Sequence, residues 1–264
     1  MQLSIIIVNY QSKEPLLYCL ASINRFLYKN SQLQNDFEVI LVNNDKQSLD
    51  NIPEYSFLNQ KIIEVGKNVG FGTGANLGAI MAQGKYLLFL NPDTLFLDNS
   101  LNKALAYLEN HREIGALGLS IISKSRRQPE NWSCGKKTTW GSILFRNTIN
   151  KPWNKKTPQK VDWSSGAGLI VRKKAFRQVK GFAKEFFMYF EDQDLCLRLA
   201  KENYQIIHYP QAKILHLNGK SWRNKQDQKK YYRQSQLVFF KKHNSRVGYF
   251  ILKAIYFVLT KFKI

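Results

Sequence analysis

The chain has 264 residues, 44% of them hydrophobic and 13% aromatic, a length that suits one large domain or two small ones. This composition excludes a disordered chain and a collagen-like or other low-complexity chain. Its 40 Lys and Arg against 19 Asp and Glu give a formal net charge of +21, which suggests a polyanionic partner such as nucleic acid, an anionic membrane or a phosphorylated substrate.

The first half of the chain alternates short apolar runs with helical patterns. Such alternation predicts βαβ units and a mostly parallel sheet covered by helices on both faces, an α/β fold. Strands are predicted at residues 3–8, 37–42, 61–65, 86–90 and 114–122, and helices at 15–26, 74–83 and 100–110.

The alternation stops after residue 123. Residues 124–160 are basic and contain three prolines and three tryptophans, so we expect a long loop with one short helix. Regular structure is expected again at residues 161–172, followed by a helix at 191–202 and a strand near 205–208.

The positive charge is concentrated in two segments. Residues 1–123 hold 9 basic and 11 acidic residues, whereas residues 124–160 hold 10 and one, and residues 219–264 hold 12 and one. This segregation favours a patch that faces an anion, and a solubilising surface is the alternative. The charge therefore lies outside the first half of the chain.

The cysteines and the N-terminal residues indicate in which cellular compartment the protein is expected. Cys19, Cys134 and Cys196 are few and widely spaced, with no CxxC pair, so neither a disulfide framework nor a zinc site is expected and a reducing compartment fits best. Residues 1–15 lack the basic region and cleavage site of a secretory signal peptide.

Amide side chains recur where the predicted strands end, at Asn9, Asn43, Asn68 and Asn91. Ligands of an open α/β sheet bind at this edge, and amides can both donate to and accept from a nucleobase or ribose. The glycine-rich stretch 70–78 follows the third strand, not the first, which disfavours a Rossmann pyrophosphate site.

Two acidic positions stand out. Asp93 directly follows the apolar run 86–90 and is either the N-cap of the next helix or a ligand for a hard divalent cation, with His216 as its candidate partner. Glu191, Asp192 and Asp194 follow the aromatic run FFMYF, where burial and like-charge crowding would raise the pKa of at least one carboxyl, as a general base requires.

Seven motifs in order across residues 3–222 resemble one family. They are SIIIVNY, VNN, KNVGFGTGANLGA, LFLNPDT, WSSGAGLIVRKKAF, FFMYFEDQDLCLR and HLNGKS. The chain resembles the inverting family 2 glycosyltransferases with a GT-A fold, most closely their rhamnosyltransferase-like branch. It differs from them at Asn43 and Asn91, where the family often has an acid, which puts metal binding and base preference in doubt.

The resemblance implies a role for individual residues. Asp192 would be the catalytic base, with Glu191 beside it, and Asp93 and His216 would bind Mg²⁺ or Mn²⁺. The residues implied to contact the nucleotide sugar are Val8, Asn9, Tyr10, Asn43, Asn68, Gly72, Asn76, Asn91 and Asp93, and those implied to line the acceptor and sugar cleft are Trp163, Gly166, Ala167 and Glu191.

The resemblance also implies a domain plan and a reaction. Residues 1–222 would form the GT-A domain, with a nucleotide half at 1–123 and an acceptor half at 124–222. The enzyme would move a sugar from dTDP-rhamnose, or alternatively a UDP-hexose, to a glycan or lipid-linked glycan acceptor. This reaction would serve bacterial surface polysaccharide synthesis at the inner face of the cytoplasmic membrane.

Residues 223–264 are predicted to form a basic, amphipathic helical extension. Lys253 divides its apolar stretch, which is too short for a membrane span and fits a helix lying in the interface of an anionic membrane. The alternative is a helix docked on the protein core.

Two other classes of function remain open. A nucleic-acid-binding module is disfavoured because the first 123 residues are net acidic and no binding motif is present. A catalytically inactive scaffold is suggested by Asn43 and Asn91, but the chain retains Asp93, Asp192 and His216.

Overall fold

The computed structural model describes residues 1–28, 36–49, 52, 59–124, 129–130, 132–144, 156–217 and 225–261. In this part of the chain a nine-stranded sheet has the order β3-β2-β1-β4-β10-β6-β11-β5, with β8 also pairing with β11. Its strands are β1 (Leu3–Asn9), β2 (Phe37–Asn43), β3 (Asn59–Glu64), β4 (Tyr86–Leu90), β5 (Thr94–Phe96), β6 (Ile114–Ser123), β8 (Gln159–Val161), β10 (Gly168–Arg172) and β11 (Gln205–His216).

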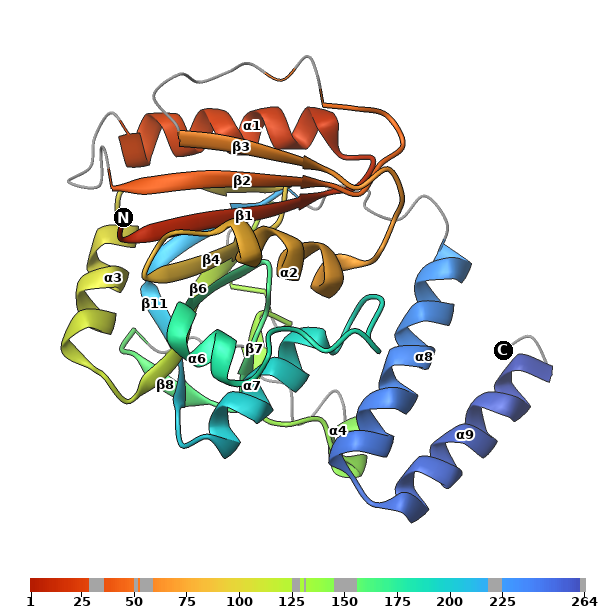
Figure 1. Ribbon diagram of the computed structural model, residues 1–264. Coiled ribbons are helices and arrows are strands. Elements are labelled where there is room, and N and C mark those ends of the chain that lie inside the picture. The colour runs from red at the N-terminus through yellow and green to blue at the C-terminus, as the bar shows by residue number, and fades with distance from the viewer. Residues whose placement is uncertain are drawn as a thin grey trace.

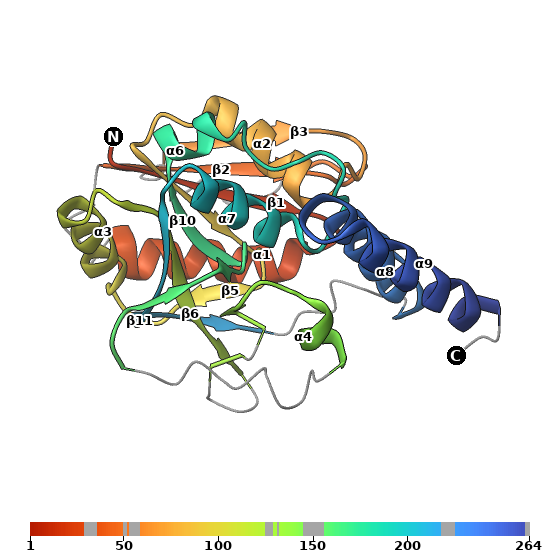
Figure 2. The ribbon, with the colours of Figure 1, turned by 90° about the horizontal axis from the view of Figure 1, so that it is seen from below.

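Helices cover both faces of the sheet (Figures 1 and 2). Alternate residues of β1 explain why: Ile5 and Ile7 face one core, and Ile6 and Val8 face the other. The first core receives α1 (Lys13–Ile23) and α3 (Leu101–Asn110). The second core receives α2 (Phe71–Met81), α6 (Lys173–Gln178) and α7 (Glu191–Lys201).

The mostly parallel α/β sheet expected from the sequence is confirmed, with antiparallel additions. β10 runs antiparallel between β4 and β6, and β5 and β8 pair antiparallel with β11. The short β5 was not expected, because three residues carry too little pattern to identify a strand. The expected strand 205–208 extends to His216 through a register shift after Tyr209.

Several helix boundaries differ from the predicted ones. α1 begins at Lys13 and passes into a π-helical turn at Asn24–Tyr28. α2 begins three residues before the predicted start, because Gly70 takes the N-cap with a φ of 83°. The regular structure expected at residues 161–172 comprises the end of β8, then β9 (Trp163–Ser164) and β10, and β9 pairs with β7 (Cys134–Gly135).

The basic segment 124–160 contains the expected short helix, α4 (Trp140–Leu144). Residues 125–128, 131 and 145–155 of the predicted loop lie outside the described residues, and so do residues 218–224, which include the predicted domain boundary at 222. The division into domains therefore stays a prediction.

Two C-terminal helices stand at one side of the molecule (Figures 1 and 2). They are α8 (Lys225–His243) and α9 (Arg246–Lys261). Phe239 and Phe240 of α8 pack with Phe186 and Phe190 of the segment before α7, and with Leu252 of α9. Among the described residues, no helix combines the length and apolarity that crossing a bilayer would need.

Candidate functional site

Three segments meet near the carboxyl edge of the sheet: the N-terminus of α2, the loop between β9 and β10, and the N-terminus of α7. The Gly166 N–H donates a hydrogen bond of 3.2 Å to Asp192 Oδ2. The Phe71 N–H donates one of 3.2 Å to the Phe187 carbonyl. A Cβ on Gly166 would lie 2.9 Å from the Phe71 ring, so only glycine allows this approach. The sequence-predicted Gly166 and Asp192 are thus brought together.

Glycines also seat the N-terminus of α2. A Cβ on Gly70 would lie 2.1 Å from the Phe187 carbonyl oxygen. A Cβ on Gly72 would lie 3.1 Å from the Cβ of Phe182 and 3.5 Å from that of Glu191. Gly72, predicted to contact the nucleotide sugar, therefore packs α2 against the segment that leads to the carboxylates. Any contact that it makes to a donor stays a prediction.

A strained turn precedes the carboxylates. Tyr189 and Phe190 have φ angles of 69° and 66°, in the left-handed region that bulky residues avoid. Such a residue costs on the order of 1–3 kcal/mol and persists only where its surroundings hold it, typically at functional sites. The turn places Glu191 and Asp192 in the first turn of α7, where the helix dipole favours negative charge.

The environment of these two carboxyls raises their pKa values, as predicted. Burial raises the pKa of Asp192 to about 6, against the lowering effect of the Gln193 and Gly166 N–H groups. Burial and the neighbouring Asp192 raise the pKa of Glu191 well above its ordinary value. Among the described residues, Glu191 Oε2 has no hydrogen-bond partner. Asp192 is therefore the better placed of the two to exchange a proton near neutral pH.

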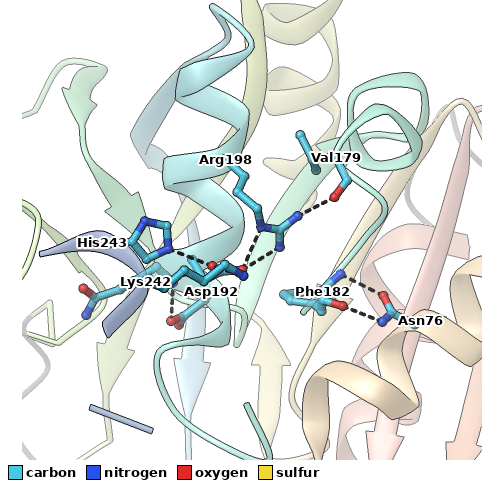
Figure 3. A network of polar contacts seen from close by, with 9 residues as sticks. Asn76, Val179, Phe182, Asp192, Arg198, Lys242 and His243 are labelled. Atoms are coloured by element: carbon cyan, nitrogen blue, oxygen red, sulfur yellow. Dashed lines mark hydrogen bonds and ion pairs between the residues drawn. The ribbon is translucent and has the colours of Figure 1, made fainter. Parts of the chain in front are cut away.

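Asp194, two residues further along, differs from both. Its fully buried carboxylate is 2.7 Å from the Arg198 guanidinium and 2.8 Å from both Lys242 Nζ and His243 Nε2. Figure 3 shows Arg198, Lys242 and His243 converging beside Asp192. These partners outweigh burial and lower the pKa of Asp194 to about 2. The sequence does not reveal this arrangement, because Lys242 and His243 lie far along the chain.

Asp93 and His216 lie together, as predicted for a metal site. Antiparallel pairing of β5 with β11 places His216 opposite Thr94, and His216 Nε2 is 3.4 Å from Asp93 Oδ1. Trp132 lies edge-on to the His216 ring, at 5.2 Å between centroids. The interpretation of Asp93 as a helix N-cap is wrong, because β5 follows it and Ser100 caps α3.

The backbone joins the two acidic positions. The Ala167 carbonyl, next to the Gly166 that contacts Asp192, accepts a hydrogen bond of 3.3 Å from the Asn91 N–H, two residues before Asp93. Backbone hydrogen bonds therefore link the segment of Asn91 and Asp93 to the segment that contacts Asp192, and a single site formed by both stays a prediction.

The amides at the ends of β1 and β2 contact each other. Asn9 Nδ2 donates to Asn43 Oδ1 at 2.9 Å, and Asn43 Nδ2 donates to Glu64 Oε2 at 2.6 Å and to the Gln47 carbonyl at 2.7 Å. Both amides are buried, at 2% exposure or less. Asn43 thus fixes the end of the sheet, and its predicted contact with the base stays a prediction. Beside them, Tyr10 is 36% exposed.

Other predicted contacts hold backbone segments in place. Asn76 makes two hydrogen bonds to the Phe182 backbone, at 2.8 and 2.9 Å (Figure 3). Asn68 accepts from the Gly70 N–H at 3.0 Å. The Trp163 indole N–H donates to a carbonyl of the neighbouring loop, at Lys136. Val8 is buried against α2, where a Cβ on Gly74 would lie 2.9 Å from it. Their roles toward a ligand are not tested by this geometry.

The three cysteines are free and buried. Burial raises the pKa of each thiol to about 12, which leaves them as unreactive core residues.

Comparisons with known proteins place the chain as a whole. The family model described as "Glycosyl transferase family 2" matches residues 4–180. A curated relative, the N-acetylglucosaminyl-diphospho-decaprenol L-rhamnosyltransferase of Mycobacterium tuberculosis, is 29% identical over 74% of this chain and 71% of its own length.

Two solved structures share the fold. Staphylococcus aureus TarS aligns with a TM-score of 0.63 and 18% identity over 97% of this chain. Mannosyltransferase PcManGT from Pyrobaculum calidifontis, in complex with GDP-Man and Mn²⁺, aligns with a TM-score of 0.63 and 17% identity over 91% of this chain. This chain spans 43% of the length of the first and 63% of the second.

Proposed function

Because this chain belongs to glycosyl transferase family 2, we propose that it transfers a sugar, with inversion, from a nucleoside diphosphate donor to a hydroxyl of a glycan or lipid-linked glycan. The proposed donor is dTDP-rhamnose, and a UDP-hexose is the second candidate. The observation that carries the proposal is Asp192, a carboxylate with a pKa of about 6 that accepts from the Gly166 N–H, next to the Ala167 carbonyl that bonds to Asn91, two residues before Asp93.

The relative from M. tuberculosis supports the donor and the acceptor. Its name describes an L-rhamnosyltransferase acting on a diphospho-decaprenol carrier. PcManGT, solved in complex with GDP-Man, is in keeping with a nucleotide sugar as donor. At 17% identity it shows a shared fold and does not indicate which nucleotide sugar this chain uses. A role in bacterial surface polysaccharide synthesis follows from the proposed donor and carrier.

Asp192 is proposed as the general base. With a pKa of about 6 it is mostly ionised at pH 7 and still basic enough to take a proton. The acceptor oxygen forms a bond to the anomeric carbon as its proton passes to Asp192, and the bond to the diphosphate breaks with the electron pair leaving on the nucleoside diphosphate. One displacement from the opposite face inverts the anomeric centre. The Gly166 N–H holds the carboxylate in position.

Asp93 and His216 fit a divalent cation. A carboxylate that is 2% exposed, with an imidazole nitrogen 3.4 Å away, offers the oxygen and nitrogen ligands that Mg²⁺ or Mn²⁺ accepts. The described residues contain no group of three His, Cys, Asp or Glu that could hold an ion alone, so donor phosphates would share it. When bound, the cation would neutralise the charge of the leaving diphosphate.

A membrane surface is the proposed location, at the inner face of the bacterial cytoplasmic membrane. α9 docks on α8 through Leu252, which agrees with the docked alternative, yet its other side is exposed. Residues 219–264 carry 12 basic residues and one acidic residue, which complements anionic headgroups. Exposed apolar side chains recur along α9 at helical spacing: Val247 at 68%, Phe250 at 63%, Ile251 at 50%, Ile255 at 41%, Phe257 at 70% and Val258 at 50%.

Calorimetry with dTDP-rhamnose tests the function. We expect the wild type to bind it more tightly with Mn²⁺ than with EDTA, and Asp93→Ala to lose the difference. A parallel assay with UDP-glucose, UDP-GlcNAc and GDP-mannose identifies the donor. Release of sugar from none of these nucleotides would contradict the proposed reaction.

Flotation with vesicles tests the location. The wild type should float with vesicles containing phosphatidylglycerol at moderate salt, and Phe250→Ser should float less. Ile80→Ser removes an equally exposed apolar residue, 72% exposed, from α2 and should change nothing. Equal flotation of the two variants would contradict membrane contact through α9.

A further inference from the structure

Helix α8 contacts the strained turn that precedes α7. The Ser235 hydroxyl donates a hydrogen bond of 2.7 Å to the Met188 carbonyl, immediately before the turn. The Phe239 ring lies 5.2 Å from the ring of Phe190. Phe190 is 4% exposed, so α8 supplies much of the cover that keeps it in the left-handed conformation.

α8 also contacts α7 just after Asp192. Asp194 is fully buried, and its Oδ1 accepts from both Lys242 Nζ and His243 Nε2 at 2.8 Å. His243 is itself nearly buried and packs on Phe239 at 5.0 Å between ring centroids. Figure 3 shows Lys242 and His243 reaching Asp192's end of α7. Ion pairs thus connect the last turn of α8 to the first turn of α7.

These contacts lie on both sides of Asp192 in the sequence. Two successive aromatic residues in the left-handed region are unfavourable by themselves and need outside packing to persist. If the turn relaxed to an extended conformation, the first turn of α7 would change direction and Asp192 would leave the Gly166 N–H. The position of Asp192 therefore depends on α8, a helix more than 30 residues later in the chain.

We propose that α8 is a positioning element for the reaction: Ser235 and Phe239 hold the Tyr189–Phe190 turn, and Lys242 and His243 hold Asp194, so that Asp192 faces the acceptor hydroxyl. The inference rests on the proposed role of Asp192 as the base. It assigns a catalytic task to a segment outside residues 4–180, which the family model matches.

The first test compares two neighbouring lysines. Lys242→Met removes a partner of Asp194, whereas Lys241→Met changes an exposed lysine for which no partner is described. With dTDP-rhamnose and the acceptor used by the wild type, we expect Lys242→Met to lower kcat about tenfold with donor KM unchanged. Lys241→Met should keep the wild-type kcat, and Lys242→Arg should restore most of it, because it returns the charge.

The second test needs no substrate. Ser235→Ala should speed amide hydrogen exchange in the peptide covering residues 186–194. Gln236→Met, which removes a hydrogen bond from the Tyr256 hydroxyl of α9 instead, should not. In turnover, Ser235→Ala should lower kcat about fivefold, the effect of one hydrogen bond.

The outcomes separate the two proposals. Wild-type kcat and wild-type exchange in both Lys242→Met and Ser235→Ala would overturn the positioning role. A rise in donor KM together with general loss of structure would overturn it too, because α8 would then support the whole fold. A wild type that transfers no sugar would contradict the proposed function. The hydrogen-exchange measurement would still test whether α8 stabilises the Tyr189–Phe190 turn.

Discussion

Two carboxyl groups in the first turn of α7, those of Asp192 and Asp194, have pKa values shifted in opposite directions. On the side that faces the α2 N-terminus and the 165–167 loop, Asp192 meets backbone N–H groups, and burial raises its pKa to about 6. On the side that faces α8, Asp194 meets Arg198, Lys242 and His243, and its pKa falls to about 2. The partners, not the residue type, decide which carboxyl has a raised pKa and which has a lowered one.

Asp192→Asn tests the reactive side most directly. The amide keeps the shape and can still accept from Gly166 but cannot take a proton, so we expect transfer to fall by about 10²–10⁴. Donor affinity, measured by calorimetry, should stay near that of the wild type. Turnover comparable to the wild type would remove Asp192 from the role of base.

Asp194→Ala tests the structural side. It leaves Arg198, Lys242 and His243 without their shared carboxylate, and breaking a buried charge pair in this way costs about 3–5 kcal/mol of unfolding free energy. Urea denaturation measures the loss. Asp227→Ala, an exposed acid on α8, serves as control and should change the free energy by less than about 0.5 kcal/mol.

Stability should depend on pH in opposite directions on the two sides. Asp194 has a folded pKa below its unfolded value of about 3.8, so its stabilisation, roughly 2 kcal/mol, is present above pH 4 and lost as pH falls toward 2. Asp192 has a folded pKa above its unfolded value, so its contribution is lost as pH rises through 6. Urea titrations of the wild type and of Asp194→Asn between pH 2 and 5 should show a smaller acid loss in the variant.

Asp192→Asn should therefore also stabilise the protein at pH 7, by about 1–2 kcal/mol, because it removes a buried charge that the fold disfavours. Thermal unfolding at pH 7 measures the gain. A lower melting temperature than the wild type would mean that the carboxylate is favourably solvated where it lies.

The reaction should also reflect the raised pKa of Asp192. Since the ionised form takes the proton, kcat should fall as pH drops below about 6 and level off above it. A pH–rate profile of the wild type measures this limb. An acid limb near pH 4 would indicate an unburied base.

Much of the sheet could be predicted from local pattern. β1, β2 and β4 are buried on both faces, so each reads as a continuous apolar run. Their boundaries follow from where the run ends in polar residues. The antiparallel β10 and the three-residue β5 could not be predicted, because strand direction and pairing depend on contacts far away in the sequence.

Some residues of the candidate site could be predicted from the sequence, and others could not. Asp192 and Asp93 could be noticed because each lies within three residues of the end of a distinctive apolar or aromatic run. The residue pattern alone did not separate Asp192 from Asp194, since both lie in one short motif, and only the family resemblance singled out Asp192. It also missed Gly70, whose φ of 83° moves the start of α2, because a glycine's conformation depends on the backbone that approaches it.

The sequence by itself indicated the class of fold, because apolar periodicity is a local property, and its motifs resembled those of the family to which the chain belongs. Residue type marked the acidic positions Asp93 and Asp192, and their chemical roles stay a proposal. Only the tertiary structure decided that Asn43 bonds to Glu64 and that α8 contacts Met188 and Asp194, on either side of Asp192 in the sequence. Each of these depends on which distant groups share a buried volume, and burial and charge partners fix a carboxylate's pKa.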